Sequence, residues 1–258
     1  MSEVKVNKVS PRSGTTLTIG DNGDTTNIVG TLQNKGGALD GVTFKEGGTN
    51  FTNSLLVGTD GTGTLNSAQG NTGVGTGVLA ALTTGDNNTV IGCGSLAATT
   101  TAVSNTMLGS NVGTAITSGS LNIGVGHATL CTLTTGSSNL AMGYLAGRLS
   151  TTATNNVALG SCSMCAMTTG SCNVAIGMCS LKASNTAANN VAVGYKSLAT
   201  VVTGTENTAV GTNSLLANTG GCNTAVGSNS LHTNTTGNNN VAVGREALYS
   251  NTTGCYNT

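Results

Sequence analysis

Apolar and polar residues alternate in a pattern that repeats along most of this chain with a period of 17 residues. The repeated unit is an asparagine, three mostly apolar residues and a glycine, as in Asn190–Gly194, which reads Asn-Val-Ala-Val-Gly. Only the step from Gly211 to Gly227 departs from the period, by one residue. Such a regular repeat is typical of a solenoid, in which each repeat forms one coil stacked on the next. The sequence therefore predicts a stack of 17-residue coils.

Each coil begins with an asparagine, for which we expect a structural role. Amide side chains stacked about 4.8 Å apart can form hydrogen bonds up and down a ladder, as in other stacked β structures. The asparagines predicted to form this ladder are Asn71, Asn88, Asn105, Asn122, Asn139, Asn156, Asn173, Asn190, Asn207, Asn223 and Asn240. A further unit begins at Asn257.

The glycine four positions after each asparagine predicts a tight turn, because glycine adopts positive φ without steric cost. These turn glycines are Gly75, Gly92, Gly109, Gly126, Gly143, Gly160, Gly177, Gly194, Gly211, Gly227 and Gly244.

The residues between the asparagine and the glycine predict a short strand with two unlike faces. Counting the asparagine as position 0, positions +1 and +3 carry larger residues and position +2 is mostly Ala, as in Val174, Ala175 and Ile176. This alternation has the period of a β-strand. We expect positions +1 and +3 to fill the coil interior, and the Ala positions to face a closely packed neighbouring chain. A second short strand is expected around the apolar residue at position +8, for example Leu181.

The predicted fold is all-β, a parallel β-solenoid or β-roll, with two regions. Residues 54–258 form the repeat shaft of about twelve rungs, starting with an atypical unit in which Ser54 replaces the asparagine. Residues 1–53 precede the regular repeat. Near-alternating apolar residues at 4–9 and 16–19 predict short strands there, so we expect a β-rich cap or attachment region.

Composition excludes several classes of protein. Only 7% of residues are charged and 2% are aromatic, the formal net charge is zero, and there are 39 glycines. Without a basic excess, nucleic acid is not an expected partner. Without an apolar run of the required length, membrane insertion is not expected. Few large side chains are available for a core, so we expect extra burial against other copies of the chain, in a homotrimer.

The cysteines are the first candidates for chemistry. Cys162, Cys165, Cys172 and Cys179 cluster in the sequence, but zinc sites usually show two pairs of ligands, and a second pair is missing here. Cys162 and Cys179 occupy equivalent positions in adjacent coils, so a disulfide is one alternative and metal binding another. We expect free, packed thiols and no metal site.

Catalytic groups are scarce in the repeat. From Asn71 onward the acids are Asp86, Glu206 and Glu246, and the two histidines, His127 and His232, fall at different positions of the repeat. Paired carboxylates for glycoside hydrolysis are therefore not expected. We predict that the chain is not an enzyme and has no catalytic residues and no cofactor.

Basic and aromatic residues are scattered over positions that we expect to face outward. Exposed aromatic rings there offer surfaces on which sugars can stack, although these residues equally fit a scattered rim. The residues concerned are Tyr144, Arg148, Lys182, Tyr195, Lys196, Arg245 and Tyr249.

The repeat motif is similar to the repeats of bacteriophage and other viral tail fibres. The stretch Asn223–Gly237 carries it: Asn-Thr-Ala-Val-Gly, then Ser-Leu two residues later, and Asn-Thr-Thr-Gly at its end. It also resembles the head repeats of trimeric autotransporter adhesins, which are left-handed parallel β-rolls. Residues 5–24 resemble the beginnings of tail fibres from marine phages. Adhesins carry a signal peptide and a membrane anchor, and we expect neither here, which is a departure from that resemblance. The repeat stops within a unit, at Asn257–Thr258, so we expect either that a C-terminal tip has been removed or that the sequence is part of a longer one.

The resemblance implies a structural virion fibre, a trimeric shaft that projects from the particle and mediates attachment to a host surface. The implied partners are further copies of the chain, another virion or tail protein bound through residues 1–53, and a host-surface glycan or protein. The implied location is the virion, after assembly in the host cytoplasm. The alternative is an extracellular or cell-surface adhesin that forms filaments. An ice-binding solenoid is a third class, disfavoured because threonine does not recur as a flat Thr-x-Thr column.

Overall fold

The computed structural model describes residues 38–39, 42–48, 51–58 and 64–258. All of these residues lie in the second of the chain's two units, Gly36–Thr258. The strands predicted at 4–9 and 16–19 lie outside the described residues. The described part of the second unit is a parallel β-solenoid of strands and turns in which no residue is helical. The predicted fold class is therefore confirmed for the repeat region.

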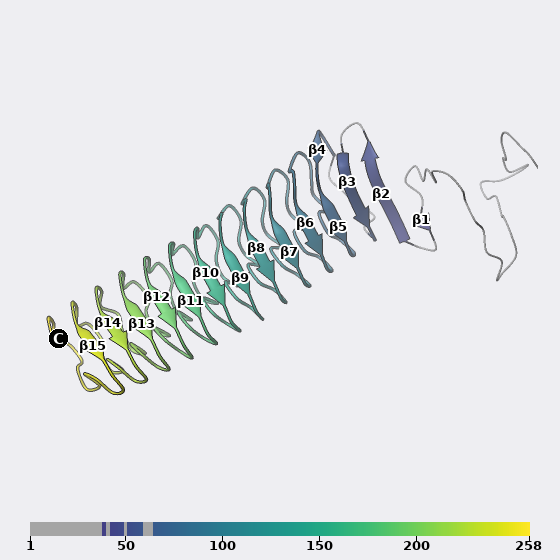
Figure 1. Cartoon of the computed structure of the whole chain (residues 1–258). Helices are drawn as coiled ribbons and strands as arrows, with labels where there is room; N and C mark the ends of the chain where they lie inside the picture. The colour runs from purple at the N-terminus through teal and green to yellow at the C-terminus, as the bar shows by residue number, and fades with distance from the viewer. Residues whose placement is uncertain (1–37, 40–41, 49–50, 59–63) are drawn as a thin grey trace, which may run out of the picture. The chain divides into compact units, whose positions relative to one another are not determined.

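The stack begins with a hairpin and continues as parallel coils (Figure 1). Strand β1 (Ala38–Leu39) pairs antiparallel with β2 (Val42–Gly48), and β2 pairs antiparallel with β3 (Phe51–Val57). Strand β3 then pairs in parallel with β4 (Ala68–Gln69) and with β5 (Thr72–Val74). The hairpin thus leads directly into the first coil.

From β5 onward each coil contributes one three-residue strand, at positions +1 to +3. Each strand pairs in parallel and in register with the strand one coil away, so that Ala175 lies opposite Ala192. The strands after β5 are β6 (Thr89–Ile91), β7 (Thr106–Leu108), β8 (Ile123–Val125), β9 (Leu140–Met142), β10 (Val157–Leu159), β11 (Val174–Ile176), β12 (Val191–Val193), β13 (Thr208–Val210), β14 (Thr224–Val226) and β15 (Val241–Val243).

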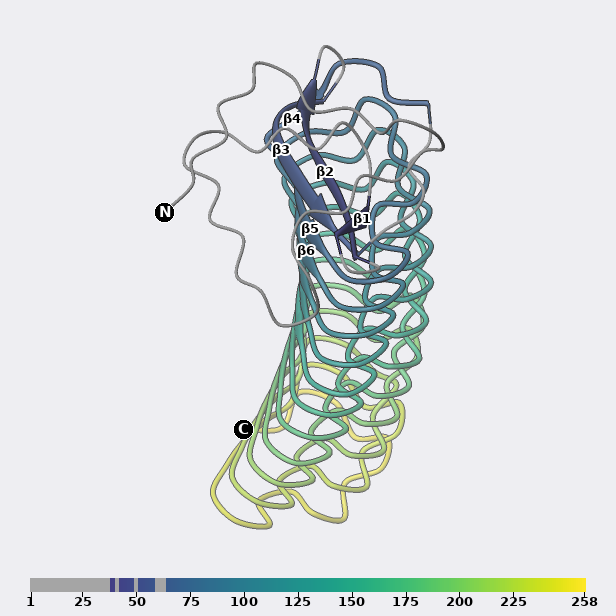
Figure 2. The same cartoon turned by 90° about the vertical axis from the view of Figure 1, so that its right-hand side faces the viewer.

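The second strand predicted around position +8 is wrong. Residues there form turns, and Leu181 and Leu198 have φ of 47° and 49°, which is the left-handed region. This conformation reverses the chain after the glycine turn and directs the leucine side chain into the coil, where both leucines are fully buried. Seen along the stack, the strands lie on one side and the turns and loops lie on the other (Figure 2).

The predicted facing of the strand is also wrong, because the Ala positions point into the coil and the larger residues point out. Ala175 is 0% exposed, whereas its neighbour Ile176 is 39% exposed. The reason is the thinness of the coil. A Cβ added to Gly73 at position +2 would lie 3.3 Å from Leu79 Cδ1 at position +8, so the leucine fills the space below the strand. A residue as small as Ala or Gly completes that core.

The short repeat closes without disturbing the stack. Asn207 Nδ2 donates to the carbonyl of Gly220, 13 residues later, whereas the other asparagines reach the carbonyl 14 residues later. The missing residue therefore falls in the loop, and Thr208 still lies opposite Thr224. One lost loop residue leaves the strand register intact.

Candidate functional site: the asparagine ladder and the outer face of the sheet

The asparagines that head the coils form a continuous buried ladder. In each step, Oδ1 of one asparagine accepts hydrogen bonds from the backbone N and from Nδ2 of the next. Asn88 makes both bonds to Asn71 Oδ1 at 3.0 Å, and its Nδ2 also donates to the carbonyl of Ala102 at 2.9 Å. Each side chain therefore joins two coils and also ties the strand to the returning loop.

The ladder runs without a break from Asn71 to Asn257. At its beginning, Ser54 Oγ accepts a hydrogen bond from Asn71 N at 2.8 Å, in the place of an asparagine oxygen. Buried polar groups are stable only when they are hydrogen-bonded. The ladder satisfies these amides entirely within the protein, so they are not free to bind a ligand.

The turn glycines have two reasons to be glycine. All eleven have φ between 124° and 134°, a region that other residues rarely adopt. In addition, a Cβ on Gly194 would lie 2.6 Å from the carbonyl oxygen of Gly211 in the next coil. The first constraint belongs to the turn itself and the second to the close stacking of successive turns, so the structure gives these glycines a structural role.

A second asparagine ladder, which sequence reasoning missed, lies in the last coils. Asn234 Nδ2 donates to Asn218 Oδ1 at 2.7 Å, and Asn251 Nδ2 donates to Asn234 Oδ1 at 3.0 Å. All three occupy position +11, which holds Leu, Ile, Met, Val, Ser or Thr in earlier coils. The recurrence of asparagine there in three successive repeats is the signal that reveals it.

The outer face of the sheet carries most of the exposed large apolar residues of the described strands. We call it the aliphatic face and define it as positions +1 and +3 of β5–β15. Its side chains are exposed or half-buried, its positions carry no charged residue, and it follows the stack coil after coil. Its exposed large residues are Val74, Ile91, Leu108, Ile123, Met142, Ile176, Val210, Val226, Val241 and Val243. Contiguous apolar surface of this kind marks interaction sites in soluble proteins.

All eight cysteines lie in the described part of the chain as free thiols. Burial raises the pKa of Cys131, and burial together with the neighbouring Cys162 raises that of Cys165. The pKa of the exposed Cys222 is raised mainly because its thiol donates to Glu206 Oε2, at 3.5 Å. A raised pKa keeps a thiol protonated and poorly nucleophilic.

The three acids of the repeat are dispersed among unrelated contacts. Asp86 accepts from the backbone N of Gln69, Glu206 accepts from Cys222, and Glu246 forms an exposed ion pair with Arg245. Among the described residues, no group of three or more His, Cys, Asp or Glu side chains is placed to hold a metal ion. The structure brings none of these carboxylates together as a pair.

The candidate aromatic residues form separate small groups. His127 stacks on Tyr144 with ring centroids 5.7 Å apart, and His232 stacks on Tyr249 at 5.0 Å. Each pair joins equivalent positions in neighbouring coils. Tyr195 instead has the ammonium group of Lys196 5.1 Å from its ring centroid. Arg148 and Lys182 are also exposed.

Within the described residues, no helix is long and apolar enough to cross a bilayer. Comparison with protein-family models, curated protein sequences and solved structures finds no match to this chain.

Proposed function

We propose that this protein is a structural fibre, in which copies of the solenoid associate through the aliphatic face to form a trimeric shaft. The observation that carries the proposal is the position of the larger apolar residues. They lie on the outside of the coil, where a monomer leaves residues such as Ile176 and Leu108 in water. Burial of apolar surface contributes about 25 cal/mol per Å², so covering this face stabilises an assembly.

A second copy of the chain matches this face better than an unrelated partner does. The face repeats once per coil, at about 4.8 Å, along the whole stack. A partner that packs against every coil needs the same repeat distance, and another copy has it by construction. The absence of charge from the face removes the electrostatic penalty for bringing identical surfaces together.

The sequence resemblance extends this proposal from a rod to a virion fibre. In that role the shaft projects from the particle, residues 1–53 dock to another virion or tail protein, and the fibre mediates attachment to a host-surface glycan or protein. Many weak contacts along a symmetric trimer then act together, because linked sites bind far more tightly than one alone. The corresponding location is the virion.

Analytical ultracentrifugation of the purified chain tests the proposal. We expect a trimer for the wild type and a folded monomer for Ile176→Lys, because the charge enters the buried interface. Thr169→Lys, at an exposed loop position, is the matched control and leaves the trimer intact. A wild-type protein that stays monomeric at micromolar concentration would contradict the proposal. Long filaments in electron micrographs, growing with concentration, would favour the extracellular filament instead.

A further inference from the structure

We infer that Cys162 and Cys179 form a reversible disulfide, joining two successive coils, when the protein meets a low-molecular-weight disulfide such as oxidised glutathione. Both cysteines stand at position +6, in the coils that begin at Asn156 and Asn173. They are the only two of the eight cysteines that occupy the same position in adjacent coils. Both are free thiols in the structure, and both are half-buried.

Hydrogen bonds hold the two cysteines one above the other. Strands β10 and β11 pair in register just before them. In the turns that follow, Cys179 N donates to the carbonyl of Ser161 at 3.0 Å, and Met164 N donates to the carbonyl of Ser180 at 3.0 Å. Equivalent residues therefore stay about 4.8 Å apart through these turns. That spacing lies within the Cα separation of about 4.4–6.8 Å that disulfides span.

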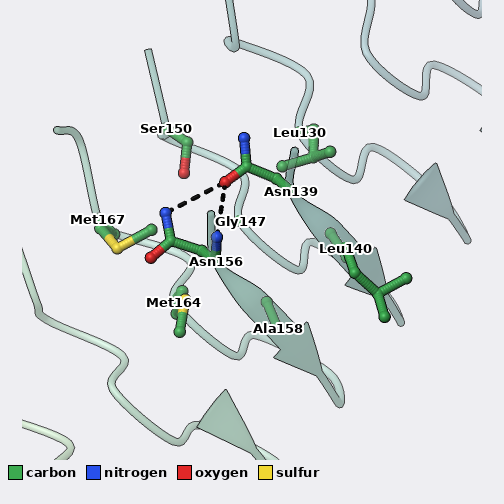
Figure 3. A pocket seen from close by; sticks show the side chains of 10 residues that line it. Leu130, Asn139, Leu140, Gly147, Ser150, Asn156, Ala158, Met164 and Met167 are labelled. Carbon is green, nitrogen blue, oxygen red and sulfur yellow. Dashed lines mark hydrogen bonds between the residues drawn. The ribbon is translucent and has the colours of Figure 1, made fainter. Parts of the chain in front are cut away.

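The two side chains leave the backbone in the same direction. Cys162 and Cys179 have φ of 54° and 59°, so the turn has nearly the same conformation in both coils. Cysteines whose Cα–Cβ bonds do not point apart can be bridged without moving the backbone. By contrast, Met164 lines the interior of the coil together with Ala158 (Figure 3). The two thiols therefore lie side by side, away from the coil interior, where a small oxidant reaches them.

Cys165 is the competing partner for Cys162, because these two thiols are neighbours within one coil. Cys165 is only 8% exposed. Burial, and after it the neighbouring Cys162, raise the pKa of the Cys165 thiol. A buried, protonated thiol exchanges slowly with disulfides, because the thiolate is the nucleophile. Cys179 is therefore the partner that the structure favours.

The reaction consists of two successive thiol–disulfide exchanges. The thiolate of one cysteine attacks a sulfur of oxidised glutathione, which breaks the S–S bond, forms a mixed disulfide and releases one glutathione thiolate. The thiolate of the other cysteine then attacks the protein sulfur of the mixed disulfide and releases the second glutathione. The two protein thiols lose two electrons, the two glutathione sulfurs gain them, and the two protons pass to the released glutathione.

Incubation of the full folded chain in a glutathione redox buffer with excess reduced glutathione tests this inference. Isolated cysteines form only mixed disulfides, which the reduced glutathione reverses, whereas the pair gains from its high effective concentration. The protein should lose two of its eight free thiols, counted by maleimide labelling after denaturation. Before labelling, its intact mass should fall by two hydrogen atoms.

Cyanogen bromide cleavage identifies the linked residues. It cuts after methionine, so Met164, Met167 and Met178 place Cys162, Cys165, Cys172 and Cys179 on separate fragments. The fragment that ends at Met164 should remain joined to the fragment that begins at Cys179 until a reductant is added.

Two variants complete the experiment. Cys179→Ser should keep all its remaining thiols in the same buffer, and position +6 accepts polar residues in other coils, such as Lys196 and Asn213. Cys172→Ser is the control, because Cys172 is exposed and its equivalents in the adjacent coils are Asn155 and Asn189, so this variant should form the link as the wild type does.

Three results would each overturn the inference: an unchanged thiol count in the wild type, a link from Cys162 to Cys165, or covalently joined chains in a non-reducing gel. The link lies within one chain, so its formation does not depend on the trimer.

Discussion

Met107 and Gly124 lie opposite each other on neighbouring strands, and the Met107 side chain occupies the core space that a side chain at position 124 would fill. They pair in register between β7 and β8, and a Cβ added to Gly124 would lie 2.9 Å from Met107 Sδ and 2.4 Å from Val112 Cγ1. Most coils have alanine at position +2. In these two coils the alanines are replaced by a methionine and a glycine. The large side chain in one coil therefore compensates for the missing side chain in the next, and the core volume is filled by the two coils together.

This pairing predicts that Gly124→Ala destabilises the fold by about 1–3 kcal/mol, because the added methyl group overpacks the core. Met107→Ala in the same chain should recover part of that loss, since the methionine sulfur is then gone. Urea denaturation of the two single variants and the double variant measures the coupling. Strictly additive effects would show that the two residues do not share space.

The asparagine ladder predicts a local loss of protection when one step is removed. Asn173→Ala should cost about 2–4 kcal/mol, because Asn190 N and Nδ2 both lose their acceptor, which is Asn173 Oδ1 at 3.0 and 3.2 Å. Hydrogen exchange should show faster exchange at the Asn190 amide and little change at Asn240. The control is Asn189→Gly, which alters an exposed residue with φ of 57° that glycine readily adopts. Unchanged exchange at Asn190 would contradict the assigned role.

The turn glycines allow backbone strain and steric contact to be separated. Gly194 and Gly244 have nearly the same φ, 129° and 124°, but a Cβ on Gly244 would meet nothing within 4 Å. Gly244→Ala should therefore reduce the free energy of unfolding only by the cost of the strained backbone, about 1–3 kcal/mol. Gly194→Ala should reduce the free energy of unfolding by more, because its Cβ also collides with the carbonyl of Gly211. Thermal denaturation of both variants measures the difference, and equal losses would argue against tight stacking of the turns.

The contact between Cys222 and Glu206 predicts a pH-dependent reactivity. The carboxylate accepts a hydrogen bond from the thiol, which raises the thiol pKa and reduces the thiolate fraction at a given pH. Glu206→Gln should lower that pKa, so Cys222 should react faster with iodoacetamide below the raised pKa. The two rates should converge at higher pH, where both proteins carry the thiolate. Peptide mass spectrometry at several pH values measures them; identical rates throughout would exclude the contact in solution.

Sequence reasoning reached the period and the strand positions because the backbone repeats with the residues. It failed on the facing of the strand. Alternation of Val174, Ala175 and Ile176 shows that the two faces differ, but not which one is inside. The assumption that larger residues are buried fails in a coil only two layers thick, where a leucine such as Leu181 fills the interior from the opposite side.

The error over the second strand has the same origin. A leucine in a repeating apolar position suggests a strand, yet Leu181 is buried from a left-handed turn, a conformation that leucine seldom adopts. Propensity could not reveal this, because the surrounding stack imposes the conformation. Gly147 departs visibly from the leucine column in the sequence, but only coordinates show that Leu130 of the preceding coil reaches into that place, where an added Cβ would lie 2.9 Å from Leu130 Cδ2.

The one-residue deletion in the coil that begins at Asn207 also bears on how such a protein changes in evolution. Each coil is closed by its own asparagine bond to the returning loop, so a change in loop size is absorbed before the next strand starts. Whole coils can then be duplicated or lost without redesign of their neighbours. The rod would lengthen or shorten in increments of about 4.8 Å, so the number of repeats sets the length of the rod.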